Sequence, residues 1–210
     1  MAIRIPNLTN SLVWVGVGLV ALSLIVPARS AERTARVETR AEEAARTLLA
    51  VAQEMEPIDL DDLDAARRLE SRFRAACAEW HGHPESYLPH LHECPSELSD
   101  VSCMMFESKH YCLMLTRSPI PIDSGVQPDR YPFEVYAWPL SLSPPGHTAF
   151  FVPEIGDPAF SRNKMRQYVG WKEDRRGHRA LPRPGCGIPR NEVEEGAYRG
   201  RDDERWILLQ

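Results

Sequence analysis

The sequence predicts an α+β fold in which a long N-terminal helix and a second helix precede an antiparallel β-sheet of about four strands. An uncharged apolar run near the N-terminus continues into a stripe of apolar residues at helical spacing. A second helical stripe follows, and beyond residue 100 short strand-like runs alternate with proline-rich turns. We expect residues 1–30 to be an anchor or signal segment, 31–56 an amphipathic helix and 57–210 an exported head domain.

The segment Ser11–Val26 contains no charged residue and is followed by Pro27. As a helix of about 16–18 residues it would be about 24–27 Å long, against a hydrocarbon core of about 30 Å. We therefore expect residues 11–27 to anchor a single-pass membrane protein with an extracytoplasmic head. The alternative is a cleaved signal peptide, because Ala28-Arg29-Ser30 before Ala31 has the small-x-small pattern of a cleavage site. Membrane orientation stays open, since arginines that follow the span favour the cytoplasmic side.

Two amphipathic helices are predicted after this segment. The first extends to about residue 56, where Pro57 stops it, and its apolar stripe should pack on the head domain or on a neighbouring copy. That stripe is Val37, Ala41, Ala44, Leu48, Val51 and Met55. The second covers about residues 60–80, with aspartates at its start and arginines later, as the helix dipole favours. Its stripe is Leu63, Ala66, Leu69, Phe73, Ala76 and Trp80.

The chain beyond residue 100 predicts an antiparallel meander, because the connections are too short for helical crossovers. The expected strands are Val101–Phe106, His110–Thr116, Phe133–Trp138 and Thr148–Val152, with a further candidate at Trp206–Leu209.

Five cysteines allow disulfides in an exported protein. Cys103 and Cys112 are symmetric about a turn at Glu107-Ser108, so a hairpin there could place their thiols opposite each other. Cys77 and Cys94 form a second candidate pair, which leaves Cys186 over. The alternative is that the cysteines are small buried apolar residues.

A histidine-rich segment is the strongest candidate for bound metal. His81, His83, His90, His92 and Cys94 supply imidazole and thiolate, which zinc and copper accept, although their spacing matches no established zinc motif. The alternative is a loop of exposed histidines without a ligand.

No motif supports catalysis. Two serine-histidine-aspartate triples can be assembled, Ser86–His90–Asp100 and Ser161–His147–Asp157. Neither has the Gly-x-Ser-x-Gly turn that presents a nucleophile. A Gly-rich phosphate loop, a Cys-x-x-Cys pair and a haem-attachment sequence are also missing, so we expect no cofactor and no enzymatic activity. Nucleic acid is an unsuitable partner, because the net charge is −5 and the basic residues are interspersed with acidic ones.

The order of these parts resembles bacterial type IV pilins and type II secretion pseudopilins. The residues that carry the resemblance are Leu12–Val26, the helix Ala35–Met55 with its TLLAVAQE stretch, and the strand-and-turn pattern Tyr131–Asn163. The prepilin peptidase site of that family is missing, because neither Gly16 nor Gly18 precedes a phenylalanine. The resemblance implies a pilin-like, membrane-anchored structural or interaction protein that self-associates or joins a secretion or filament system. The alternatives are an exported metal-binding module and a secreted head domain.

Overall fold

The computed structural model describes residues 8–81, 88–119, 131–141, 147–170, 180–190 and 193–209, with the backbone alone for residues 8–25 and 79–81. This part of the chain forms two α-helices, α1 (Leu8–Glu54) and α2 (Leu63–His81), and the 3-10 helix η2 (Ser96–Leu98). The strands are β1 (His90–His92), β2 (Cys103–Glu107), β3 (Tyr111–Arg117), β4 (Phe133–Pro139), β5 (Ala149–Pro153), β6 (Ala159–Ser161), β7 (Ala197–Arg199) and β8 (Arg205–Leu208).

The strands form one sheet of eight, in the order β1-β2-β3-β4-β5-β6-β8-β7, with every pair antiparallel. The prediction of a pilin-like sheet of about four strands is therefore wrong. The five runs chosen from the sequence correspond to β2, β3, β4, β5 and β8. The strands β1, β6 and β7 have three residues each, too few for an alternating pattern, and form because an adjacent strand offers them hydrogen bonds.

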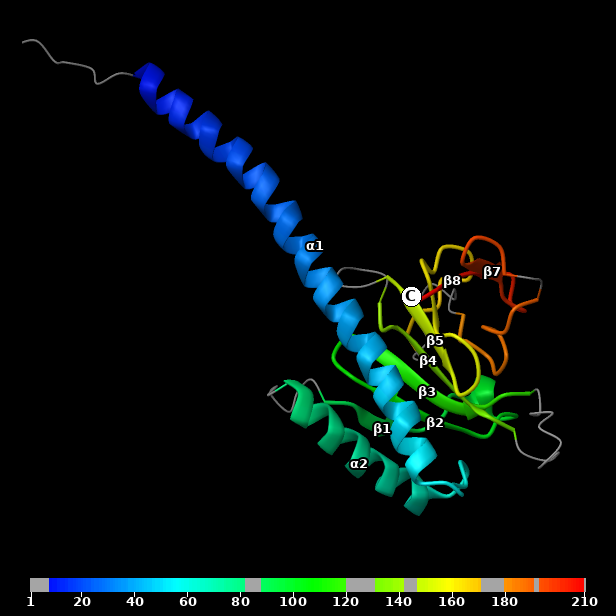
Figure 1. The fold of residues 1–210 in the computed structure, drawn as a ribbon. Helices are drawn as coiled ribbons and strands as arrows, with labels where there is room; N and C mark the ends of the chain where they lie inside the picture. Colours follow the sequence, from blue (N-terminus) through cyan, green and yellow to red (C-terminus); the bar gives the residue numbers. More distant parts are fainter. Residues whose placement is uncertain are drawn as a thin grey trace, which may run out of the picture.

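Both helices pack on one face of the sheet, where α1 crosses β3, β4 and β5 with α2 beside it (Figure 1). The predicted stripe of α1 is confirmed, since Val37, Ala41, Leu48 and Val51 are buried and Ala44 and Met55 partly buried. In α2, Ala66, Leu69 and Phe73 are buried as predicted. Leu63 is 58% exposed, because it is the first residue of α2, and the side chain of Trp80 lies outside the described residues. We call this apolar layer the helix-side core.

The opposite face of the sheet is also covered, by the segments that follow β6. Along each strand, the residues between those of the helix-side core point to this opposite face. There they pack against Tyr168, Cys186, Tyr198 and Trp206. We call this second layer the far-side core. Because both faces are covered, β3 and β4 are buried along almost their whole length.

The start of α2 is capped by an aspartate. The carboxylate of Asp62 accepts hydrogen bonds from the backbone N–H groups of Asp64 at 3.0 Å and Ala65 at 3.2 Å. These groups have no partner within the helix, so the aspartate satisfies them. Within the acidic cluster before α2, Asp62 therefore has a capping role.

The expectation of a membrane span is corrected by the structure. Among the residues whose side chains it describes, no helix combines the length and apolar character needed to cross a bilayer. This finding contradicts the predicted single-pass membrane location with an anchor at residues 11–27. The side chains of residues 8–25 lie outside the described part. The backbone of α1 is helical through Pro27 and past Ala31.

Candidate functional site

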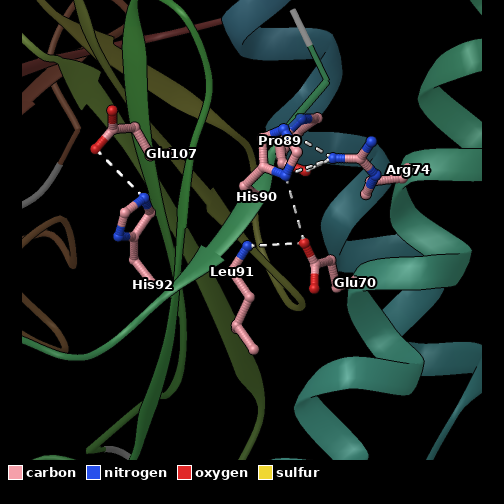
Figure 2. A network of polar contacts seen from close by, with 7 residues as sticks. All are labelled: Glu70, Arg74, Pro89, His90, Leu91, His92 and Glu107. Atoms are coloured by element: carbon pink, nitrogen blue, oxygen red, sulfur yellow. Dashed lines mark hydrogen bonds and ion pairs between the residues drawn. The ribbon is translucent and has the colours of Figure 1, made fainter. Parts of the chain in front are cut away.

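Strand β1 carries two of the histidines predicted to bind metal. It pairs with β2 at the edge of the sheet, and Leu91 between the two histidines packs against the helix-side core. Figure 2 shows that the two rings face different partners, His90 toward α2 and His92 toward Glu107 of β2.

His90 lies against an arginine of α2. Nη1 of Arg74 is 2.6 Å from Nδ1 and 2.9 Å from Nε2 of the ring, and it donates to the carbonyl of Pro89 at 3.3 Å. One turn earlier on α2, Glu70 accepts a hydrogen bond from the backbone N–H of Leu91 at 3.1 Å and lies 3.7 Å from Nδ1 of His90. The guanidinium occupies the side of the ring from which a metal ion would bind, and its positive charge opposes such binding. Arg74 and Glu70 together attach β1 to α2.

His92 and Cys94 also have protein partners. Nε2 of His92 is 3.6 Å from a carboxylate oxygen of Glu107, and the thiol of Cys94 donates to the carbonyl of Cys103 at 2.9 Å. Within the described residues, no group of three or more histidine, cysteine or acidic side chains is arranged to hold a metal ion. The side chain of His81 and all of His83 lie outside that part. Metal binding by the five-residue cluster therefore stays a prediction.

The predicted disulfide pairs are not brought together. The hairpin of β2 and β3 turns at Ser108–His110, so the centre of the turn lies two residues after the predicted one at Glu107-Ser108. As a result Cys103 faces Thr116 and Cys112 faces Glu107. Cys77 belongs to the helix-side core, whereas Cys94 packs against the far-side core. All five cysteines are free thiols. Burial raises the pKa of Cys77 to about 12 and raises that of Cys112 and Cys186, which keeps these thiols protonated and unreactive.

A network of buried acidic side chains in the far-side core was missed in the sequence. Glu134 accepts from the hydroxyl of Tyr136 and the N–H of Gly185, both at 2.8 Å. Glu204 accepts from the hydroxyl of Ser161 at 2.6 Å and from the N–H groups of Met165 and Arg166 at 3.0 and 2.7 Å. Each carboxylate fastens a loop to a strand, which is a structural role. A signal existed for Glu134, which interrupts an otherwise apolar strand.

This network also accounts for one of the two serine-histidine-aspartate triples. Ser161 is fully buried and its hydroxyl donates to Glu204, so it is not available as a nucleophile. The other triple includes Ser86, which lies outside the described residues.

The N-terminal part of α1 extends away from the rest of the protein (Figure 1). From Val26 to Arg36 every side chain is exposed except the half-buried Thr34, and Val37 is the first of the described side chains that belongs to the helix-side core. Glu38 marks this boundary, because Oε1 accepts hydrogen bonds from the N–H groups of His147 and Thr148 and from the hydroxyl of Thr148 at 3.1, 3.2 and 2.7 Å. We call residues 8–36 the projecting segment. It is the candidate interaction site.

No protein-family model, curated protein or solved structure matches this chain. The comparisons therefore assign it to no family, and the resemblance to pilins and pseudopilins stays a prediction.

Proposed function

We propose that this protein is a structural subunit that assembles with further copies of itself through the projecting segment of α1. The observation that supports the proposal is that α1 is much longer than the part of it that packs on the sheet. The 47 residues of α1 span about 70 Å at about 1.5 Å per residue, yet among the side chains that the structure describes, Val37 is the first that packs in the helix-side core.

The sequence of the projecting segment divides it into two parts. Residues 11–26 contain no charged side chain, whereas residues 29–36 carry arginines and a glutamate, including an ion pair between Arg36 and Glu32. Charged residues at this spacing keep a helix solvated. A helix that is apolar on all sides needs an apolar partner, because burying such surface lowers the free energy of the system, mainly through the entropy that water gains. The apolar part is therefore the contact surface, and the charged part is a spacer.

We infer that the projecting segment binds the same segment of a second copy. Two helices without charged side chains at their contact can pack closely along their length, because the side-chain ridges of one helix fit into the grooves of the other. A short apolar helix alone is marginally stable in water, so association also stabilises the helical conformation itself. In this arrangement the N-terminal segments of α1 pack together at the centre of the assembly, and the sheet of each copy lies outside them.

Site-specific cross-linking of the full-length chain tests the proposal. Cysteine replaces the exposed Ala28 next to the apolar part, and Ser71 on the exposed face of α2 receives the same replacement as the control. A short bismaleimide should link two copies through Ala28→Cys and leave the Ser71→Cys chains without a cross-link. Equal cross-linking at both positions would point to random collision and would overturn the proposal.

Sedimentation gives an independent measurement of the assembly. Replacing Leu19 and Leu22 by glutamate should convert the assembled chain to monomers, because each charge must lose its hydration in a helix interface. Circular dichroism checks that the body stays folded. Unaltered protein that sediments as a monomer at every concentration would also contradict self-assembly.

A further inference from the structure

Two cysteines that the sequence placed in different pairs lie close together, Cys103 at the start of β2 and Cys94 two residues beyond the end of β1. The register of β1 with β2 pairs His90 with Glu107, Leu91 with Phe106 and His92 with Met105. Continued by two residues, the same register sets Cys94 opposite Cys103. Opposite residues of an antiparallel pair have Cα atoms about 4.5–5.5 Å apart, within the range of about 4.4–6.8 Å that disulfides need.

The side chains agree with this register. The Cys94 thiol donates to the carbonyl of Cys103 at 2.9 Å, and the two thiols are hydrogen-bond partners of each other. Both residues line one surface cavity of about 240 Å³ between α2 and the end of β1, together with Asp61 and His92. Cys94 is half-buried and Cys103 is 7% exposed, so a reagent in this cavity reaches Cys94 first.

The two thiols also differ in acidity. The hydrogen bond from the Cys103 thiol lowers the pKa of Cys94, against smaller opposing effects of burial and of Asp61. The same hydrogen bond raises the pKa of Cys103, and burial raises it further. The thiolate is therefore concentrated on the more accessible sulfur, which is the order that thiol-disulfide exchange requires.

We propose that Cys94 and Cys103 form an intramolecular disulfide by exchange with a small organic disulfide. The Cys94 thiolate attacks one sulfur of the oxidant, whose S–S bond breaks and releases one thiol. Cys103 then loses its proton and attacks the Cys94 sulfur of the mixed disulfide, which releases the second thiol. The cysteine pair loses two protons and two electrons, and the oxidant gains them as two thiols.

This bond would close the loop that contains η2. Leu98 of that helix is 1% exposed in the far-side core, so the loop is already folded against the protein before the bond forms. The remaining thiols, Cys77, Cys112 and Cys186, are buried with raised pKa values, so exchange is selective for the pair.

Peptide mapping of the full-length protein after incubation with oxidised glutathione tests the proposal. A protease that cleaves after glutamate cuts at Glu93, Glu97 and Glu107, so it separates Cys94 and Cys103 onto the peptides 94–97 and 98–107. These peptides should be recovered joined, and they should separate on reduction. Recovery of Cys94 joined to the peptide of Cys77 or Cys112, or with no disulfide at all, would overturn the proposal.

Two alanine variants add a second measurement. Cys103→Ala removes the second sulfur, so glutathione should stay attached to Cys94 as a stable mixed disulfide that intact mass detects. Cys112→Ala is the matched control, because Cys112 is also buried in the far-side core and should leave the 94–103 linkage intact. Equal retention of glutathione by the unaltered protein and by Cys103→Ala would contradict the exchange step. If a variant fails to fold, the peptide mapping of the unaltered protein still decides whether the bond forms.

Discussion

At the scale of single residues, the informative side chains are the polar ones that the fold buries. Glu134 and Glu204 are each 2% exposed, and each accepts two or more hydrogen bonds, at least one of them from a loop distant in sequence. A carboxylate buried in this way is stable only while its donors are in place. Such residues hold the C-terminal segments against the sheet.

Replacing Glu204 by alanine should lower the free energy of unfolding by about 2–4 kcal/mol, because the hydroxyl of Ser161 and two backbone N–H groups lose their acceptor. Urea denaturation measures the loss. Glu194→Ala is the control, since Glu194 is exposed and its removal should cost less than about 0.5 kcal/mol. Equal effects of the two variants would contradict the role assigned to Glu204.

His110 should make stability dependent on pH. Burial lowers its pKa, helped by the charges of Lys109, Arg33 and Arg40, so the folded protein binds its proton less readily than the unfolded chain does. The stabilisation is complete above about pH 6.5, the ordinary pKa of histidine, and is lost as pH falls toward the lowered value.

Denaturation at a series of pH values measures this dependence. His110→Gln should lose stability less steeply than the unaltered protein between pH 6.5 and more acidic conditions. Ser71→Ala is the control, because this exposed side chain carries no titratable group, and it should keep the original slope. A steeper acid limb in His110→Gln would mean that the histidine is stabilised in its charged form.

At the scale of elements, helix packing follows the apolar stripes with one exception at a helix end. Leu48 of α1 is fully buried between the sheet and α2, whereas Leu63 begins α2 with 58% of its surface exposed. The spacing of the two residues within their stripes is equivalent, so the difference comes from position along the helix. A stripe tells which face is inward but not where the supporting surface ends.

These two leucines make a matched pair of variants. Leu48→Ala should destabilise the protein by about 2–5 kcal/mol, because it opens a cavity in the helix-side core. Leu63→Ala should cost less than about 1 kcal/mol, since most of the side chain is already in water. Thermal or urea unfolding provides both values, and a larger loss for Leu63→Ala would show that α2 packs differently.

At the scale of the whole molecule, one sheet joins two cores. Adjacent residues of β4 alternate between them, with Val135 and Ala137 in the helix-side core and Tyr136 and Trp138 in the far-side core. Loss of either layer exposes the other face of the same strands to water. The two cores should therefore unfold together.

Unfolding in urea followed by two signals checks this cooperativity. Far-UV circular dichroism reports mainly on α1 and α2. The difference in tryptophan fluorescence between the unaltered protein and Trp206→Phe reports on Trp206 in the far-side core. Both signals should change at the same urea concentration. Separate midpoints would mean that the helix layer and the C-terminal segments are independent units.

Some features of this protein follow from local sequence. The stripes of α1 and α2 and the runs of β2, β3, β4 and β5 could be located because side-chain period is set by residues close together in the chain. The stop near Pro57 and the aspartate cap of α2 are local for the same reason. The projecting length of α1 needs the structure, since only the sheet defines where coverage begins.

Tertiary structure alone decided the number of strands, the hairpin register and the cysteine neighbours. The strands β1, β6 and β7 carry too few residues for a pattern and are defined by the hydrogen bonds of the strands beside them. The β2–β3 register places Cys103 opposite Thr116 rather than Cys112, and the segment after β1 places the Cys94 thiol 2.9 Å from the carbonyl of Cys103. Each of these outcomes depends on hydrogen bonds between strands, whose partners local periodicity does not specify.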